Sequence, residues 1–312
     1  MRLSSTQTIQ YIALAAVISS VMYLMVGTSV VFIVPLLIFA HRFSTTKEAL
    51  IPVGIVAFVL LFYQIVIGSR GLNIDATYIL TLLIGLYMPI MMLIGAALWI
   101  ALPHKRVVKL LVIMGIAALG GLVIIVWFSS GNQSATSVEQ VYRTYVESVA
   151  PQLLGASGVN TAGIFDYVVL TLRLMFLPLF MAQFGLSVLI SDLIVYRHDE
   201  TYQERLVNFA LPESFVWPFL GLWALVLFSL VLPHLLLQTI AVNGALVLSM
   251  LYIIQGMAIA SYWLRKRNPA VKASRIYVLA SLIVLLPPVN VITLVILPLV
   301  GVSETWIKYR KN

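Results

Sequence analysis

A single apolar stretch, residues 243–267, constrains the fold of this chain more than any other feature. It carries no charged side chain before the basic cluster at 265–267, and about 20 apolar residues at ~1.5 Å each are enough to cross the hydrocarbon core of a bilayer. Because Lys and Arg collect on the cytoplasmic side of membrane proteins, we expect this helix to end in the cytoplasm, with Tyr262 and Trp263 at the interface. The stretch therefore predicts a membrane helix of defined direction.

The composition extends this prediction to the whole chain. Of its 312 residues, 62% are hydrophobic and only 10% are charged, and a surface of that composition could not be solvated in a soluble protein. We predict an all-α fold, a polytopic transmembrane helix bundle of about eight or nine spans plus an extracytoplasmic amphipathic helix. The net charge of +8 resides in short basic loops, where topology explains it, so we expect no nucleic-acid partner.

The apolar runs divide the chain into three parts. Residues 1–197 are predicted to form a six-helix membrane bundle that includes a polar outer loop at 129–164, residues 198–213 a cytoplasmic linker, and residues 214–312 the C-terminal membrane helices. Lys and Arg concentrate in the segments that this layout places inside, with Arg70 and Arg143 outside, as the charge rule requires. The helices are predicted at 9–40 (two short helices joined by a turn at 27–29), 50–68, 77–102, 110–128, 165–196, 215–232 and 238–264.

The polar outer loop is predicted to contain an amphipathic helix. Thr136 and Glu139 have the spacing of a capping box. Apolar side chains recur at helical intervals, at Val138, Val141, Tyr145, Val149 and Leu153. Such a helix would lie along the outer membrane surface or over the mouth of the bundle, and a passive linker is the alternative.

The last apolar segment has two possible arrangements. Pro287 and Pro288 lie in its middle, and proline breaks a helical hydrogen-bond ladder. The segment is therefore either a re-entrant hairpin that returns the basic tail to the cytoplasm or a single span that leaves the tail outside. The tail charge favours the hairpin, whose open backbone groups near Asn290 would need a partner; Gln255 is the candidate.

Polar side chains inside apolar segments are costly and mark either helix contacts or sites. Arg173 could hold a carboxylate or phosphate through its planar guanidinium, although it could also extend to the outer interface. The predicted ligand-binding set is Arg173, Tyr87, Trp127, Gln183 and Gln64. For the amides an interhelical hydrogen bond is the alternative, and this structural role is predicted for Gln255, Asn243 and Asn290.

Groups for catalysis are missing at useful spacing. The chain has no cysteine and its four histidines are scattered, at 41, 104, 198 and 234. Paired carboxylates, a metal-ligand cluster or a nucleotide-binding glycine loop are not found in the sequence. We therefore expect a protein that is not an enzyme and that holds no cofactor or metal.

Three sequence blocks carry a resemblance to a known family. Residues 211–218 read LPESFVWP, residues 252–260 read YIIQGMAIA and residues 301–310 read GVSETWIKYR. Together they resemble the signatures of the YybS-like bacterial multi-pass membrane proteins, a domain of unknown function, with Glu304 in place of the usual Asp and Lys308 departing as well. The resemblance implies a bacterial cytoplasmic (inner) membrane protein, and the basic loops place its N-terminus in the cytoplasm.

The N-terminal six helices are similar to a second group. The short proline-containing segment at 34–42 reads VPLLIFAHR and is similar to the substrate-binding S components of energy-coupling-factor transporters. This likeness implies a solute-binding or transport component for a small, possibly anionic metabolite.

A non-catalytic cell-envelope scaffold is the alternative function. Small side chains recur at four-residue spacing, in the pairs Ala15/Ser19 and Ala16/Ser20, and permit close helix contact. This face could dock a membrane-protein partner or could pack within the bundle. The lipid bilayer is the one partner that both functions require.

Overall fold

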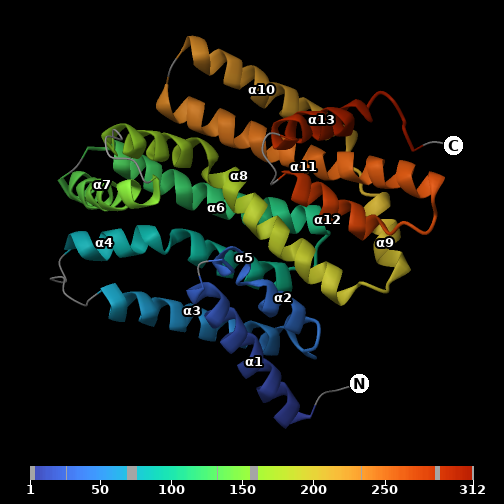
Figure 1. Ribbon diagram of the computed structural model, residues 1–312, viewed down its shortest axis with the longest axis horizontal. Coiled ribbons are helices and arrows are strands. Elements are labelled where there is room, and N and C mark those ends of the chain that lie inside the picture. The colour runs from blue at the N-terminus through green and yellow to red at the C-terminus, as the bar shows by residue number, and fades with distance from the viewer. Residues whose placement is uncertain are drawn as a thin grey trace. The chain divides into compact units, whose positions relative to one another are not determined.

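The computed structural model describes residues 4–25, 27–68, 76–131, 133–154, 161–232, 234–284 and 289–310, and the regular structure in these ranges is helical throughout (Figure 1). Among the described residues, six helices are long and apolar enough to cross a membrane. They are Ser5–Leu24, Thr46–Val66, Arg106–Ser129, Gly163–Val195, Glu213–Val231 and Leu235–Arg267. Three shorter apolar helices accompany them, at Ser29–Ala40, Tyr87–Ala101 and Thr293–Ser303. The chain is an all-helical, multi-pass membrane protein by the length and composition of these helices.

The chain forms two compact units, Met1–Ser191 and Asp192–Asn312. The boundary lies close to the predicted end of the first bundle at residue 197. The segment 198–213, predicted as a linker, packs inside the second unit, where Tyr202 and Gln203 are buried.

The first unit contains eight α-helices and a 3-10 turn among its described residues. A capping box starts the first helix, because the Ser4 side chain accepts from the Gln7 amide at 3.3 Å and Gln7 accepts from the Ser4 amide at 3.1 Å. The elements are α1 (Ser5–Leu24), η1 (Ser29–Val31), α2 (Val34–Ala40), α3 (Thr46–Gly68), α4 (Ala76–Gly85), α5 (Tyr87–Ala101), α6 (Arg106–Ser129), α7 (Gln133–Leu154) and α8 (Thr161–Val195).

The small-residue face of α1 is used inside the first unit. Ala15, Ala16 and Ser19 are buried, and α1 packs against α2 and α3. Ser20 is half-buried. The first unit therefore buries most of this face, as the packing alternative requires.

The predicted helix at 77–102 loses one hydrogen bond near its middle. α4 ends at Gly85 and α5 begins at Tyr87, with the fully buried Leu86 between them. Pro89 explains the interrupted ladder, because a proline at this position has no N–H for the Gly85 carbonyl and its ring collides with that carbonyl. Leu86 keeps helical dihedral angles, its N–H donates to the Leu82 carbonyl at 2.9 Å and its carbonyl accepts from the Ile90 N–H at 2.9 Å, so α5 continues α4 with a single missing bond.

α7 is the predicted amphipathic helix, but it begins earlier than the sequence suggests. Its first residue is Gln133, so Thr136 lies inside the helix and the predicted capping box is wrong. Val138 is fully buried, and the Tyr142 hydroxyl donates to the Thr81 carbonyl of α4 at 3.0 Å. α7 thus packs on the bundle through the first half of its apolar stripe, whereas the side chains of Tyr145, Val149 and Leu153 lie outside the described set.

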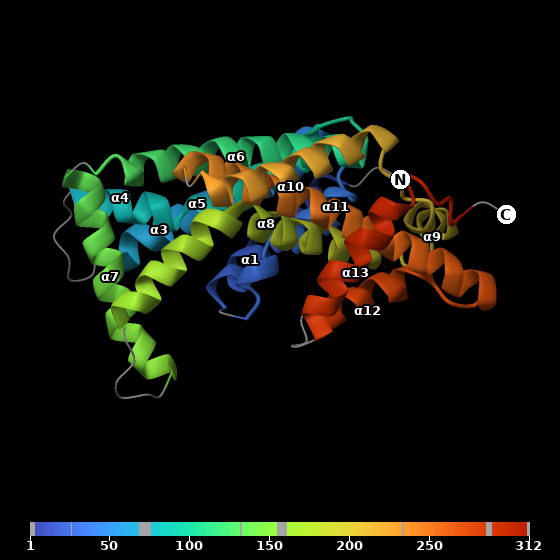
Figure 2. The ribbon, with the colours of Figure 1, turned by 90° about the horizontal axis from the view of Figure 1, so that it is seen from above.

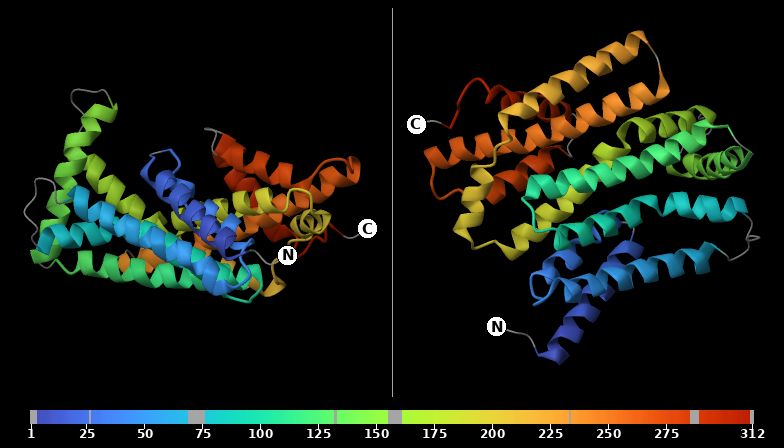
Figure 3. Two further views of the ribbon diagram at one scale, coloured as in Figure 1. Left: turned by 90° about the horizontal axis from the view of Figure 1, so that it is seen from below. Right: turned by 180° about the vertical axis from the view of Figure 1, so that it is seen from behind.

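The second unit is built around α11. It contains α9 (Glu200–Val207), η2 (Glu213–Phe215), α10 (Val216–Val231), α11 (Leu235–Arg267), α12 (Ala273–Val284) and α13 (Val289–Ser303). α11 contains the stretch 243–267 that organises the sequence, and it packs against α9, α10, α12 and α13. α10 and α11 form the antiparallel pair seen from behind in Figure 3.

The last two helices form a hairpin rather than a single span. α12 and α13 lie side by side (Figure 2), and Pro287 and Pro288 lie between them, outside the described residues. At one end of the hairpin Tyr277 of α12 donates to the Leu206 carbonyl at 2.9 Å, and Arg310, which follows α13, donates to the Val207 carbonyl at 2.7 Å. The first turns of α12 and the segment after α13 therefore both contact α9.

This geometry yields a direct topological prediction. A cysteine at Glu200 and a cysteine at Lys308 should be labelled from the same side of the membrane by an impermeant thiol reagent, because both positions are exposed and the chain between them returns to α9. The natural chain has no cysteine, so each single variant is free of background labelling. Labelling of the two positions from opposite sides would contradict the hairpin.

Candidate functional site

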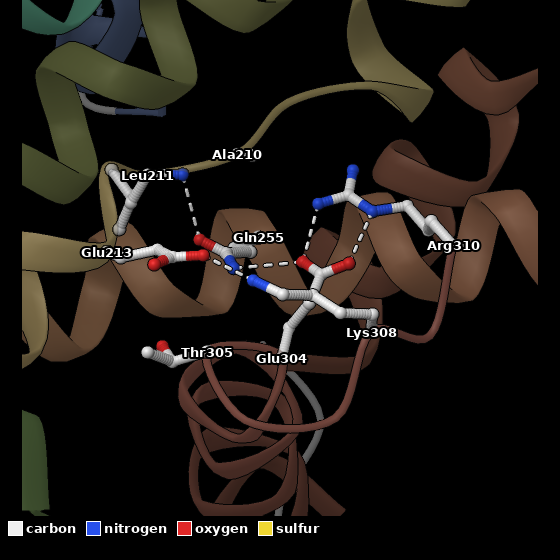
Figure 4. A pocket seen from close by; sticks show the side chains of 8 residues that line it. All are labelled: Ala210, Leu211, Glu213, Gln255, Glu304, Thr305, Lys308 and Arg310. Carbon is white, nitrogen blue, oxygen red and sulfur yellow. Dashed lines mark hydrogen bonds and ion pairs between the residues drawn. The ribbon is translucent and has the colours of Figure 1, made fainter.

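A cluster of polar side chains lies between the helices of the second unit (Figure 4). We call Gln255, Glu304 and Arg310 the polar cluster. Arg310 donates to both carboxylate oxygens of Glu304, from Nε to Oε1 at 2.6 Å and from Nη2 to Oε2 at 2.5 Å. Gln255 donates to the same Oε2 at 2.9 Å. The side chains of Arg310 and Glu304 are only 14% and 10% exposed, so the ion pair is largely removed from water.

Gln255 joins three segments that are far apart in the sequence. Its side-chain oxygen accepts the Leu211 amide at 2.9 Å, and its nitrogen also donates to the Gly301 carbonyl at 3.1 Å. The amide thus ties the loop before α10 to α11 and α13. It was predicted to serve the backbone near Asn290; its hydrogen bonds instead go to Leu211, Gly301 and Glu304, and the Asn290 side chain lies outside the described set.

Arg310 is held by backbone as well as by Glu304. Its Nη1 donates to the carbonyls of Val207 at 2.7 Å and Phe209 at 2.9 Å. A buried ion pair is tolerated only when further hydrogen bonds satisfy its remaining donors and acceptors, and these carbonyls together with Gln255 do so here. The cluster therefore fastens the C-terminal tail to the segment after α9.

Close approach of two helices positions the polar cluster. A Cβ at Gly256 would lie 2.2 Å from the Leu297 carbonyl oxygen, and a Cβ at Gly301 would lie 2.2 Å from the Tyr252 carbonyl oxygen. α11 and α13 are therefore in backbone contact at this crossing. Only with the helices this close can the short side chain of Gln255 reach both Gly301 and Glu304.

A hollow of about 230 Å³ opens beside the polar cluster. On its rim Lys308 forms an ion pair with Glu213. The side chain of Lys308 is 40% exposed and that of Glu213 is 72% exposed. The charged groups of the hollow are thus paired with one another, and it offers neither a nucleophile beside a base nor an open carboxylate pair. In the described ranges no group of three His, Asp or Glu side chains could hold a metal ion.

In the first unit, side chains that pack on two glycines of α6 show how far along the helix axes Tyr87 and Arg173 lie. Tyr87 packs on Gly120 of α6, and Phe176 of α8 packs on the adjacent Gly121. Arg173 precedes Phe176 by three residues, or about 4.5 Å along a helix. Tyr87 and Arg173 thus lie within about one helical turn of the same depth. The Tyr87 hydroxyl donates to the Ala117 carbonyl of α6, and Arg173 is half-buried.

The other predicted ligand residues lie at different levels. Trp127 is about two turns further along α6 than Gly120, and Gln183 is about two turns beyond Phe176 on α8. Gln64 donates to the Tyr23 hydroxyl of α1 at 3.2 Å, which is the interhelical bond that was the alternative for the amides. None of the five predicted residues lines a hollow of the second unit.

The structural amide in α11 has a local partner. Asn243 is buried and donates to the Thr239 carbonyl, one turn earlier in the same helix, at 2.9 Å.

In α7, outside the apolar spans, Arg143 lies between Glu139 at 3.3 Å and Asp166 at 3.0 Å. Hydrogen bonds to these carboxylates, first that of Glu139, raise the pKa of the Arg143 guanidinium.

Comparisons with protein-family models, curated proteins and solved structures give no match to this chain. The ion pair of Glu304 and Arg310 was missed by reasoning from sequence, which singled out Gln255 alone. A signal for it was present, because the polar cluster lies in two of the three blocks, 252–260 and 301–310, and the Leu211 amide of the block 211–218 donates to it.

Proposed function

We propose that this chain is a bacterial cytoplasmic-membrane protein whose first unit binds a small anionic solute as a component of a transport system. The observation that carries the proposal is the interrupted hydrogen-bond ladder between α4 and α5, where Pro89 has no N–H to donate to the Gly85 carbonyl. Membrane transporters build their binding sites from discontinuous helices whose interrupted backbone can serve a ligand. Pro89 leaves the Gly85 carbonyl without its helical donor in this way.

Polar groups surround this interruption. Tyr142 of α7 reaches the Thr81 carbonyl, and a Cβ at Gly85 would lie 3.5 Å from the Tyr142 hydroxyl. Tyr87, one residue past Leu86, carries a second hydroxyl, which donates to the Ala117 carbonyl of α6. Arg173, at nearly the same depth, supplies the positive charge that favours an anion. The basic segments favour a cytoplasmic N-terminus.

Ligand binding tests the proposal through two variants. Purified protein in detergent should show a raised melting temperature with one or more small carboxylates or phosphates from a metabolite library. Arg173→Ala should weaken the binding of such a ligand roughly 10- to 100-fold, since hydrogen bonds to charged groups contribute about 1.5–3 kcal/mol. Tyr87→Phe should weaken it by about two- to tenfold.

Two matched variants guard against general destabilisation. Arg42→Ala removes an exposed arginine, and Tyr63→Phe removes a hydroxyl from α3; both should bind as the natural protein does. Crosslinking in native membranes separates the two functional classes. Recovery of a nucleotide-hydrolysing coupling complex supports transport, whereas recovery of cell-wall synthesis proteins with no ligand response from the purified protein would replace it by the envelope scaffold.

A further inference from the structure

A second hollow in the second unit lies where α11 ends. Its volume is about 330 Å³, and it is lined by Val207 of α9, by Tyr262, Arg265 and Lys266 of α11, and by Pro269. It therefore combines two cations with apolar walls. The residues that line the first hollow are different ones, although Arg310 of the first hollow donates to the carbonyl of Val207, which lines the second.

No ion pair in the described part of the chain neutralises the cations of this hollow. The ion pairs of the described ranges involve Arg143, Arg205, Lys308 and Arg310, and neither Arg265 nor Lys266. On the adjacent α9, Asp199 pairs with Arg205 at 3.5 Å, and the carboxylates of Glu200 and Glu204 are exposed. Two cations thus face one cavity without a carboxylate between them, which favours an anion there.

The position of the hollow along α11 matches a membrane interface. α11 has 33 residues, about 50 Å at 1.5 Å per residue, and so extends well past a hydrocarbon core of about 30 Å. Trp263 is 50% exposed and directly follows Tyr262, which lines the hollow. Trp is typical of the headgroup level. An anion in the hollow would accordingly lie next to exposed apolar surface.

We infer that this hollow binds the phosphate group of an anionic phospholipid, held by Arg265 and Lys266, with its acyl chains along Trp263. Arg presents a planar fork that matches phosphate oxygens, and Lys adds a compact charge. The shared chemistry is a phosphate anion, and a free phosphate ion could satisfy it as well. The site is separate from the solute site proposed in the first unit.

Thermal unfolding of the full-length protein in detergent tests this inference. The probes are phosphatidylglycerol, phosphatidylcholine with the same acyl chains, and inorganic phosphate. Phosphatidylglycerol should raise the melting temperature at a lower concentration than phosphatidylcholine. The variant Arg265→Gln/Lys266→Gln should need a roughly 25-fold higher concentration of phosphatidylglycerol, about fivefold for each cation near a membrane surface. The control Lys47→Gln/Lys105→Gln removes the same charge from exposed positions in the first unit and should respond as the natural protein does.

The outcomes separate the sources. Stabilisation by phosphatidylglycerol that depends on Arg265 and Lys266 supports the lipid site. Equal stabilisation by inorganic phosphate with the same dependence supports the phosphate site with a soluble ligand. Identical responses of the two double variants, or no preference of the natural protein for an anionic probe, would overturn the inference. These results leave the solute proposal for the first unit unaffected, because its test uses other residues and other ligands.

Discussion

Gly301→Ala is expected to force α13 away from α11 and to lower the free energy of unfolding of the second unit by about 3 kcal/mol. The new Cβ would lie 2.2 Å from the carbonyl oxygen of Tyr252, and a backbone atom cannot rotate away as a side chain can. Gly256→Ala meets the Leu297 carbonyl oxygen at the same distance and should act alike. Separation of the helices also pulls Gln255 from Gly301 and Glu304.

The matched control for this prediction is Gly221→Ala in α10 of the same unit. A Cβ there would meet nothing within 4 Å, so the variant should gain up to about 1 kcal/mol from the higher helix propensity of alanine. Thermal unfolding in one detergent, followed by circular dichroism, compares the three variants. A Gly301→Ala protein that melts at or above the temperature of Gly221→Ala would show that the helices are not in backbone contact.

Glu304→Ala is expected to destabilise the second unit by about 3–5 kcal/mol, because it leaves the buried guanidinium of Arg310 without its counter-charge. Arg310→Ala should destabilise the second unit by a similar amount. It leaves the buried Glu304 carboxylate without its counter-charge, and it removes the hydrogen bonds to the carbonyls of Val207 and Phe209. The double variant should cost clearly less than the sum of the two single ones, because neither charge is then left alone.

The exposed ion pair of Lys308 with Glu213 provides the comparison. Its side chains are 40% and 72% exposed, so Glu213→Ala should change stability by no more than about 1 kcal/mol. Hydrogen exchange adds a local measurement: in Glu304→Ala the amides of residues 301–310 should exchange faster, while those of α10 change less. Additive single-variant effects, or a tail that remains protected, would argue against a buried coupled pair.

The boundaries of several helices follow from local sequence, and their errors have local causes. The turn predicted at 27–29 falls between α1 and α2. The missing hydrogen bond at the Gly85 carbonyl was not predicted, because Pro89 was not compared with the carbonyl four residues before it. In α7 the pair Thr136 and Glu139 fits a capping pattern, yet the helix extends back to Gln133, since spacing alone cannot show where the first helical hydrogen bond forms.

The ligand residues illustrate a different limit. Burial in an apolar run identifies Gln64 as a polar group that needs a partner, and Tyr23 of α1 satisfies it. The sequence offers no means of choosing that hydroxyl over a solute. The common depth of Tyr87 and Arg173 depends on which glycines of α6 admit an aromatic ring, and this is a property of three packed helices.

The amino-acid sequence by itself determined that the chain is helical and apolar enough to cross a membrane several times, and that the stretch 243–267 is its organising helix. These properties depend on composition and on runs of neighbouring residues, which act over a few turns. The tertiary structure alone decided that the last segment folds back to α9 and that Gln255, Glu304 and Arg310 meet. The contact between Gln255 and Glu304 spans 49 residues of sequence, and it forms where the backbones of α11 and α13 approach so closely that only glycine fits between them. The place where two helices cross is set by packing, and no local pattern specifies it.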